Sequence, residues 1–422
     1  MTTTDKIYDL IVVGGGAAGL MASVVAADRG CQVLLVEKMD QAGRKLRITG
    51  KGRCNLTNTA PLKDYLTHVG SDSRFLRNCM SQFFNTELME FFSKRGVELV
   101  EERGGRVFPK SGRSLDIFLA LINDLEQRPN VEIRKNCTVQ SLDVATDDEG
   151  RSKVCGVRLA TGVHLAARHV LVATGGLSYP TTGSTGSGYR WAAELGHTVV
   201  PQVPSLVALV CQEPVDEVLV GFALKNVALR VVDAQGKELS NHFGEMSFCH
   251  DGLAGPIVLS TSRQVSRRLH DGERLTALID FKPAIDRATL DRRLIADLNS
   301  NGTRIFNDAL RLWLPAEVIP TALKAMHIEY YKRLNQINGQ ERRRLLDFLK
   351  GASFTLCGTH DFSEAIVTQG GVSLKEVNPK TMESRLVQGL HFAGEVLDLD
   401  ADTGGYNLQI AFSTAVAAAR SI

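Results

Sequence analysis

The chain has 422 residues, of which 44% are hydrophobic and 23% are charged, and its 49 basic and 47 acidic residues nearly balance. This length predicts two or three domains, and the composition is that of an ordinary globular protein. No stretch approaches the roughly 20 uncharged apolar residues of a membrane span, and the N-terminal segment lacks the pattern of a secretory signal. We therefore expect a soluble, cytoplasmic protein whose net charge favours no particular partner.

The eight cysteines lie singly along the chain, at positions 31, 54, 79, 137, 155, 211, 249 and 357. None belongs to a C-x-x-C pair or to a Cys/His spacing typical of zinc sites. We therefore predict no metal ion, no disulfide framework and no dithiol redox pair.

A βαβ unit is predicted at the start of the chain. Residues 8–13 form a continuous apolar, β-branched run, as expected of a strand buried on both faces, and they lead directly into the sequence GGGAAG. A helix of small residues is expected over 17–29, and a second strand over 32–36 ends at Glu37. The right-handed crossover of such a unit places Glu37 at the carboxyl edge of the strand beside the first.

Gly14, Gly16 and Gly19 form a GxGxxG pattern between this strand and helix. The first glycine turns the chain, the second admits a pyrophosphate against the backbone, and the third lets helix and strand pack. Glu37 can accept hydrogen bonds from the ribose hydroxyls of an adenosine and disfavours a 2′-phosphate, so the ligand is FAD or NAD. The neighbouring residues Ala18 and Lys38 are also expected at the cofactor.

The rest of the chain changes character several times. Short alternating strands over 131–173 predict a β-meander, which ends in the returning strand HVLVAT. Strand-like runs over 201–282 predict a small antiparallel sheet or barrel, and 285–350 is helical in pattern. The tail resumes strands and ends in a helix over 406–419.

Two further segments favour FAD over NAD. ATGG follows the returning strand, and HFAGEVLDLDADTGGYNLQ places a glycine pair before the last helix. The amides of that helix N-terminus could stabilise an anionic reduced flavin. The cofactor residues expected from these segments are Thr174, Gly175, Gly394, Glu395, Gly405, Asn407 and Leu408.

A third segment, GRKLRITGKGRCNLTN, combines basic residues with glycines and asparagines. Here the chain resembles the HI0933-like family of FAD-dependent flavoproteins, whose signatures are similar to GxKxxxSGxGRCNxTN and AGExxDxxxxxGGYNxQxAxxTG. The stretch from Thr174 to Tyr189 and the motif FTHxGxSGP at Phe248 to Pro256 also match, with Cys249 and Ala254 as departures. The resemblance extends over essentially the whole chain.

The resemblance implies an α/β fold with a discontinuous Rossmann-type FAD-binding domain. Residues 1–200 and 370–422 would form this domain, 201–284 and 351–369 a small β-barrel-like insert, and 285–350 a helical insert. It also implies that Arg44, Arg53 and Asn55 lie along the pyrophosphate and isoalloxazine of FAD, and that the Val139 backbone faces the adenine. Because no second GxGxxG is present, NAD(P)H would visit the flavin transiently.

The family relatives are associated with reduction of enone steroids and with dihydrouridine in large-subunit ribosomal RNA, so we expect a reductase of an activated C=C bond. Flavin chemistry delivers hydride to one carbon, and an acid must protonate the other. Cys54, His250 and Tyr179 are the candidate acids.

Clustered cations favour ribosomal RNA, or a ribosome-assembly intermediate, over a steroid. They are Lys332, Arg333, Arg342, Arg343, Arg344, Lys350, Arg263, Arg267 and Arg268. Two alternatives remain: an amine or amino-acid oxidase, which would produce hydrogen peroxide, and a non-catalytic flavin-binding regulator, which would turn nothing over.

Overall fold

The computed structural model describes residues 6–70, 72–146 and 150–422. They divide into two compact units, Met1–Val203 with Ile366–Ile422, and Pro204–Ala365, which we call the first and the second unit. No helix in the described part of the chain is long and apolar enough to cross a membrane.

The first unit is built on a seven-stranded sheet in the order β6-β2-β1-β9-β8-β7, with β18 added beside β9. Its parallel strands are β6 (Val131–Arg134), β2 (Val33–Val36), β1 (Tyr8–Val13), β9 (His164–Val172) and β18 (Leu390–Phe392). The antiparallel meander comprises β7 (Val139–Thr146), β8 (Ser152–Leu159) and the first part of β9.

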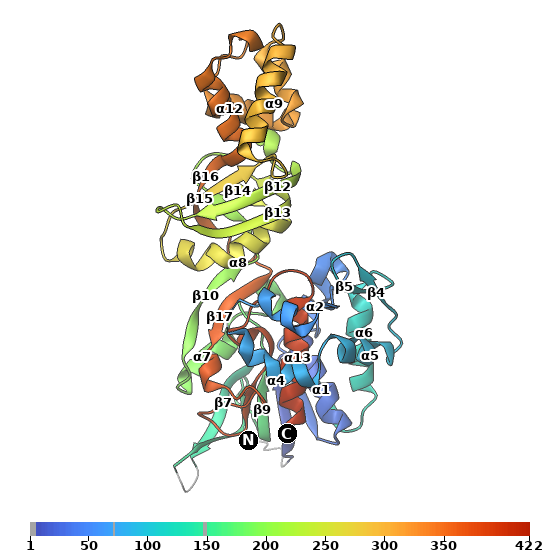
Figure 1. Cartoon of the computed structure of the whole chain (residues 1–422). Coiled ribbons are helices and arrows are strands. Elements are labelled where there is room, and N and C mark those ends of the chain that lie inside the picture. The colour runs from blue at the N-terminus through green and yellow to red at the C-terminus, as the bar shows by residue number, and fades with distance from the viewer. Residues whose placement is uncertain (1–5, 71, 147–149) are drawn as a thin grey trace. The chain divides into compact units, whose positions relative to one another are not determined.

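Helices bury the central strands of this sheet. Leu10, Ile11 and Val12 of β1 are fully buried, which explains why that strand is apolar without alternation. α1 (Ala17–Asp28) and α13 (Tyr406–Arg420), from opposite ends of the chain, pack against each other (Figure 1). Both are rich in alanine and other small residues, which allows close packing.

The register brings several loops to one edge of the sheet. Val13 pairs with Val36 of β2 and with Val172 of β9, and Phe392 of β18 also pairs with Val172. Because these strands are parallel, the loops that follow them leave the sheet at the same carboxyl edge.

One predicted strand lies elsewhere than expected. Residues 131–134 were expected in the meander, but β6 pairs in parallel with β2 at the edge of the main sheet. An edge strand is half-buried and alternates like a meander strand, so its pattern does not distinguish the two positions.

Smaller elements complete the first unit. A three-stranded sheet has the order β3-β5-β4, and β10 pairs with β17. The bounds are α2 (Arg44–Ile48), β3 (Thr57–Asn58), α3 (Leu62–Tyr65), α4 (Arg77–Gln82), α5 (Asn85–Ser93), β4 (Leu99–Glu102), β5 (Arg106–Pro109), α6 (Ser114–Glu126), α7 (Ser187–Glu194), β10 (Val199–Ser205) and β17 (Val367–Val372).

The second unit contains a closed antiparallel barrel in the order β11-β14-β13-β12-β15-β16. Its strands are β11 (Leu209–Cys211), β12 (Ala223–Val232), β13 (Glu238–Cys249), β14 (Gly252–Ala254), β15 (Leu275–Asp280) and β16 (Ala352–Thr359). β15 alternates buried and half-buried residues, as a barrel strand must. α8 (Pro256–His270), which the sequence reading did not predict, packs against β13 and β16.

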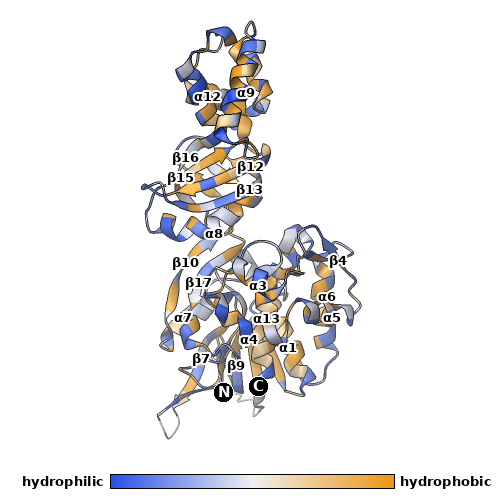
Figure 2. Ribbon diagram, in the orientation of Figure 1, coloured by the Kyte–Doolittle hydropathy of each residue, from blue (hydrophilic) through white to orange (hydrophobic). Residues whose placement is uncertain are grey.

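The remaining helices of this unit are α9 (Arg287–Ser300), α10 (Phe306–Ala309), α11 (Ile319–Met326) and α12 (Gly339–Gly351). α9 and α12 carry both hydrophobic and hydrophilic residues, and their leucines share one core with the barrel (Figure 2). The Rossmann-type α/β fold, the closed barrel and the helices confirm the predicted fold class. The exact domain boundaries, and a separate helical domain over 285–350, stay predictions.

Candidate cofactor site

The turn after β1 has the geometry that a dinucleotide requires. Gly14 has a φ of 106°, and a Cβ there would lie 2.5 Å from the Ala173 carbonyl oxygen. A Cβ on Gly19 would lie 1.8 Å from the Gly14 carbonyl oxygen, so α1 packs directly on the turn. On Gly16, in contrast, a Cβ would meet no described atom beyond its chain neighbours within 4 Å. The space that the second glycine should leave for a pyrophosphate is therefore open.

The Glu37 carboxylate is buried and oriented at the end of β2. One of its oxygens accepts a hydrogen bond from the Gly15 amide at 2.7 Å, and the other accepts from the Met39 amide at 2.8 Å. Each carboxylate oxygen has a second lone pair, so both can still accept a ribose hydroxyl. The segment that leads to Val139 lies close by, since the Cys137 amide donates to the Glu37 carbonyl oxygen at 2.9 Å.

The loop after β9 lies against the segment that follows β2. Lys38 Nζ donates to Thr185 Oγ1 at 2.6 Å, and a Cβ on Gly183 would lie 3.0 Å from Met39. Thr174 Oγ1 is buried and has no hydrogen-bond partner among the described residues. A buried hydroxyl is rarely left unpaired, so this oxygen marks a position for a polar ligand atom.

A charged pair joins this loop to the last part of the chain. Lys45 Nζ lies 2.7 Å from Glu395 Oε2 and 2.5 Å from Ser178 Oγ, and Ser178 Oγ donates to Glu395 Oε1 at 2.6 Å. The Thr368 amide also donates to Glu395, at 2.8 Å. Burial alone would raise the pKa of Glu395, but the charge of Lys45 and these hydrogen bonds hold the pKa below its usual 4.5.

The N-terminus of α13 begins at a glycine cap. Its cap residue Gly405 has a φ of 97°, and the described first turn has neither a capping side chain nor an acidic residue. With its amide oriented to satisfy both groups, Asn55 accepts from the Gly405 amide at 3.1 Å and donates to the Thr57 carbonyl oxygen at 3.2 Å. The segment before β3 thus reaches the helix N-terminus, whose partial positive charge favours an anion.

Other predicted cofactor residues make contacts within the protein. Asn407 closes its own loop through Ala401, and Leu408 packs on the core. Gly394 lies against Ala18, since a Cβ there would be 3.0 Å from the Ala18 Cβ. None of these contacts tests a role in binding FAD, so these assignments stay predictions, as does that of Gly175.

Both predicted arginines are also engaged. Arg44 pairs with Asp40 at 2.7 Å, while Arg53 pairs with Glu102 and stacks over the Phe108 ring at 4.3 Å. Both arginine side chains remain partly exposed in these contacts, so they can still turn toward a phosphate.

The three predicted proton donors occupy different environments. Cys54 is fully buried, and burial raises the pKa of its thiol to about 12. Tyr179 is half-buried beside Ser178 in a left-handed backbone conformation with a φ of 51°. His250 is exposed in the turn between β13 and β14, in the second unit. The first unit therefore contains two of the three.

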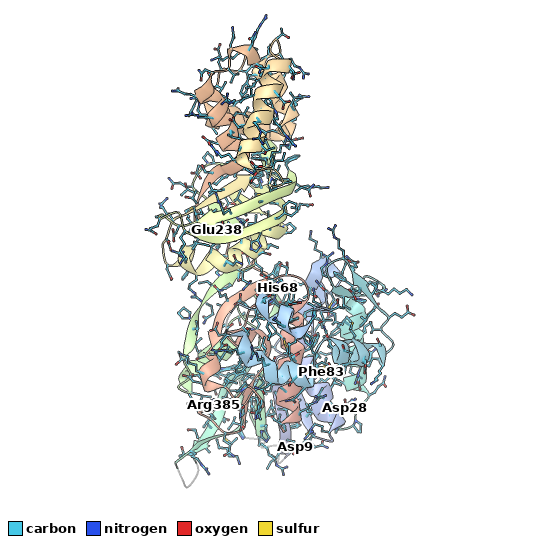
Figure 3. The ribbon with its side chains drawn as sticks, in the orientation of Figure 1. Asp9, Asp28, His68, Phe83, Glu238 and Arg385 are labelled. Carbon is cyan, nitrogen blue, oxygen red and sulfur yellow. The ribbon has the colours of Figure 1, made fainter. Side chains whose placement is uncertain are left out.

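Sequence reasoning missed two polar residues of this region. Lys45 lies next to the predicted Arg44, at the lysine position of the GxKxxxSGxGRCNxTN signature, and the structure adds its contact with Glu395. His68 (Figure 3) stacks on the Tyr406 ring at a centroid distance of 4.5 Å, and its Nδ1 lies 2.9 Å from Asp402. No motif surrounds His68, so no sequence signal could have indicated it.

Taken together, these residues fit FAD. The open space at Gly16, the unpaired Thr174 hydroxyl and the N-terminus of α13 would suit the pyrophosphate, a polar ligand atom and an anionic ring edge, respectively. The Glu37 carboxylate would suit the adenosine ribose.

Comparisons with known proteins agree with this site. Residues 8–421 match the model of the HI0933-like protein Rossmann domain. The chain is 32% identical to the 3-dehydro-bile acid delta(4,6)-reductase of Clostridium scindens, over 97% of this chain and 98% of that protein. It is 30% identical to the ribosomal RNA dihydrouridine synthase of Escherichia coli, over 98% of both chains.

Among solved structures, the fold resembles that of the 3-ketosteroid delta1-dehydrogenase from Sterolibacterium denitrificans, with a TM-score of 0.52. The two chains are 14% identical, and the match covers 98% of this chain and 99% of the other. At this identity the likeness concerns the fold alone.

Replacing Glu37 should weaken FAD binding. Glu37→Ala removes the charged acceptor for the ribose hydroxyls and leaves the Gly15 and Met39 amides unpaired, at a cost of about 1.5–3 kcal/mol per charge-assisted bond. We expect the Kd for FAD, measured by flavin fluorescence titration, to rise roughly tenfold or more. Glu98→Ala, which removes an exposed carboxylate from the same unit, is the control. An unchanged Kd in Glu37→Ala would show that this carboxylate does not contact FAD.

Replacing Glu395 should reduce the dependence of the free energy of unfolding on pH. Because its pKa is lower in the folded than in the unfolded protein, Glu395 stabilises the fold above pH 4.5 and loses this effect as pH falls through the folded value. Glu395→Gln should lower the free energy of unfolding at pH 7 by about 1–3 kcal/mol, with Lys45 left unpaired. The difference from the wild type should shrink below pH 4.5 in urea titrations of the flavin-free protein. A difference that is constant with pH would contradict the ion pair.

Proposed function

This chain belongs to the HI0933-like family of FAD-dependent oxidoreductases, and from this premise we propose that it reduces the C5=C6 bond of uridine in ribosomal RNA. Two full-length relatives support this substrate by name: the ribosomal RNA dihydrouridine synthases of E. coli and of Haemophilus influenzae, the latter 28% identical over 98% of both chains. The bile acid reductase shares the same chemical demand, which is a C=C bond that accepts hydride. These relatives share the reduction of a C=C bond but differ in the substrate that carries it.

The chain's own residues have defined tasks in this reaction. When bound, FAD supplies the hydride that adds to one carbon of the C=C bond. Glu37 and the glycine turn hold the adenosine and the pyrophosphate, while Asn55 and the α13 N-terminus meet the ring edge. Lys45 and Glu395 fix the loop that carries Ser178 and Tyr179.

We favour Tyr179 as the residue that protonates the second carbon. It is half-buried and adjoins Ser178, whose hydroxyl the Lys45–Glu395 pair holds in place. Cys54, in comparison, is fully buried, and its high pKa makes it a weak acid. His250 belongs to the second unit, and its exposed turn offers no comparable fixation.

The observation that carries the RNA substrate is a surface of the second unit. Tyr330 and Tyr331 are large aromatic residues that remain 46% and 72% exposed. The adjoining Lys332 pairs with Glu341 at 2.7 Å, which holds this segment against the start of α12. We call five exposed residues of this segment and of α12 the basic-aromatic patch: Tyr330, Tyr331, Arg333, Arg343 and Arg344.

This patch has the two features that single-stranded RNA requires. Exposed aromatic rings stack on unpaired bases, and arginines that are not engaged elsewhere contact phosphates. Arg333, Arg343 and Arg344 form no ion pair with any residue that the structure describes. A base must leave its stack to reach a flavin, so unpaired RNA should be preferred to a duplex.

Several cations that were counted toward RNA binding are not free for it. Lys332, Arg342, Lys350 and Arg268 pair with Glu341, Asp291, Asp280 and Glu273, respectively. Arg263 is buried in α8. The cations available to bind RNA are thus fewer than the sequence indicated. Arg333, Arg343 and Arg344 of the basic-aromatic patch are among those that remain.

We further propose NAD(P)H as the electron donor and the cytoplasm as the location. The sequence contains a single GxGxxG, so the donor would reach the flavin transiently rather than occupy a second Rossmann domain. A steroid-like enone is the second candidate substrate, because the bile acid reductase matches this chain at 32% identity.

Tyr179→Phe should impair the protonation step specifically. Removing a general acid typically lowers the rate about 10²–10⁴-fold, so conversion of uridine in a single turnover should slow by this amount. Reduction of the flavin by NAD(P)H needs no acid at the substrate and should be unchanged, which makes it the internal control. Uridine conversion at the wild-type rate would exclude Tyr179 as the donor.

Removing charge from the basic-aromatic patch should weaken RNA binding. In Arg343→Ala/Arg344→Ala, the slope of log K against log salt should fall by up to about 0.7 for each lost phosphate contact on a single strand. Arg29→Ala/Arg168→Ala is the control, because both arginines lie in the first unit toward the edge of the sheet opposite the glycine turn.

The same variants test the substrate in the cell. A strain that lacks the gene should lose a two-hydrogen mass increment from its ribosomal RNA, and the wild-type and control genes should restore it. The double variant should restore it poorly. If the deletion leaves every dihydrouridine of ribosomal RNA intact, the RNA substrate is excluded and the steroid-like enone takes its place.

A further inference from the structure

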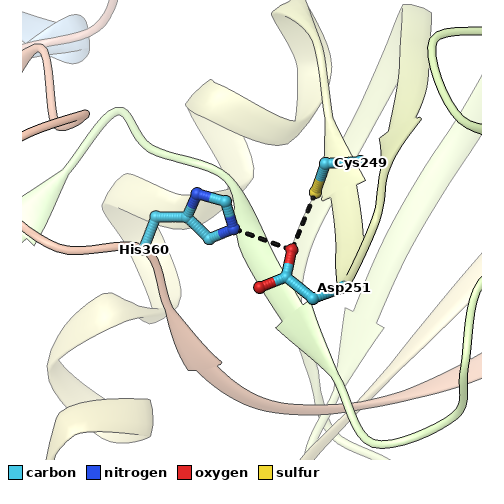
Figure 4. A group of neighbouring side chains, drawn as sticks. All are labelled: Cys249, Asp251 and His360. Atoms are coloured by element: carbon cyan, nitrogen blue, oxygen red, sulfur yellow. Dashed lines mark hydrogen bonds and ion pairs between the residues drawn. The ribbon is translucent and has the colours of Figure 1, made fainter.

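Three potential metal ligands meet on the barrel of the second unit. Cys249 Sγ, one Asp251 carboxylate oxygen and a ring nitrogen of His360 all lie within 4.8 Å of one another. Asp251 Oδ1 is 3.4 Å from Cys249 Sγ and 2.9 Å from His360 Nε2 (Figure 4). His360 lies 109 residues from Asp251 in sequence, so no local spacing motif could predict the cluster.

The backbone of the barrel holds each member in place. Cys249 is the last residue of β13 and pairs with Gly252 of β14. The Asp251 carbonyl oxygen accepts from the Cys211 amide at 2.8 Å, and the His360 amide donates to the Ala208 carbonyl oxygen at 3.1 Å. The three side chains therefore converge from backbone that hydrogen bonds already fix.

We propose that this cluster is a Zn²⁺ site. Zn²⁺ binds thiolate, imidazole and carboxylate at about 2.0–2.3 Å, which places the ligand atoms of a tetrahedral site about 3.3–3.7 Å apart. The separations of 2.9 and 3.4 Å around Asp251 Oδ1 approach these values, so side-chain shifts of less than about 1 Å would complete the site. A mixed sulfur, nitrogen and oxygen set suits Zn²⁺ better than Mg²⁺ or Ca²⁺, which prefer oxygen alone.

A fourth residue supports this role for His360. Its other ring nitrogen, Nδ1, lies 2.9 Å from Glu364 Oε2. Histidines that bind metal commonly donate their second N–H to a carboxylate, which fixes the ring and directs the free lone pair to the metal. Glu364 occupies that position, which leaves Nε2, 2.9 Å from Asp251 Oδ1, as the nitrogen available to exchange this contact for the metal.

The site is accessible and leaves one position free. Asp251 is exposed, and Cys249 and His360 are half-buried, so the ion can enter from solvent. Three protein ligands leave the fourth tetrahedral position to water. Bound Zn²⁺ would tie the β13–β14 turn to the segment after β16. Cys249 is also where this chain departs from the FTHxGxSGP motif, so the site is a property of this chain rather than of the motif.

Titration of the full-length flavoprotein with Zn²⁺ tests the proposal. After treatment with a chelator, isothermal titration should show one Zn²⁺ per chain. Co²⁺ should give a thiolate-to-metal absorption band in the difference spectrum against the untreated flavoprotein. Cys249→Thr should abolish this band and weaken Zn²⁺ binding at least a hundredfold. Glu364→Gln, which removes only the carboxylate behind His360, should weaken binding about 10–100-fold.

Cys357→Ser is the matched control, because this exposed thiol of the same barrel faces the Val210 carbonyl oxygen at 3.7 Å instead. It should bind Zn²⁺ like the wild type. Flavin content and thermal unfolding show that each variant is folded. Asp251→Asn, which preserves the shape of the side chain, provides a second test if Cys249→Thr does not fold. Failure of the wild type to bind Zn²⁺, or equal affinity in Cys249→Thr and wild type, would overturn the proposal.

Discussion

The parallel pairing of β1 with β9 determines where the loops of the first unit meet. It brings the turn after β1 so close to the loop after β9 that a Cβ on Gly14 would lie 2.5 Å from the Ala173 carbonyl oxygen. Only a glycine with a positive φ can pass there. Because β18 pairs with the other side of β9, the C-terminal segment is led to the same edge, and α13 packs on α1. Both ends of the chain therefore contribute to one site.

Electrostatics around this site follow from that convergence. The N-termini of α1 and α13 direct partial positive charge to the edge of the sheet, where a dinucleotide places its phosphates and its flavin. Lys45 adds a full positive charge, and Glu395 balances it within the protein. The Glu37 carboxylate lies at the end of β2, where its negative charge would favour hydroxyls over phosphates. The distribution of charge thus matches the distribution of groups along FAD.

Features with a local sequence signature could be predicted, and features that depend on distant residues could not. The strand, the glycine turn and α1 follow from adjacent residues, so the Rossmann unit could be predicted, while the role of Gly16 at a pyrophosphate stays a prediction. The pair formed by Lys45 and Glu395 joins residues 350 positions apart, and no local sequence pattern predicts that they meet. The strand β6 resembles a meander strand because edge positions alternate. α8 lies between strand-like runs, which hid its helical pattern.

The number of lysines and arginines in a sequence does not show which of them are free to bind a partner. The sequence reveals how many lysines and arginines the helices of the second unit carry, but ion pairs such as Lys332 with Glu341 appear only in the folded chain. The sequence also does not show that Tyr330 and Tyr331 are exposed, and only their exposure makes them candidates to stack on bases. The same holds for Cys249 and His360, which looked like isolated residues in the sequence. The exposure and the neighbours of these residues therefore depend on the tertiary structure.

Chromatography of the flavin released from the purified, denatured protein decides which flavin the first unit holds. If the glycine turn and Glu37 bind the adenosine half of the cofactor, the flavin must be FAD, because FMN lacks the adenosine. We expect one FAD per chain. Recovery of FMN alone, or of no flavin after the protein is incubated with FAD, would contradict it.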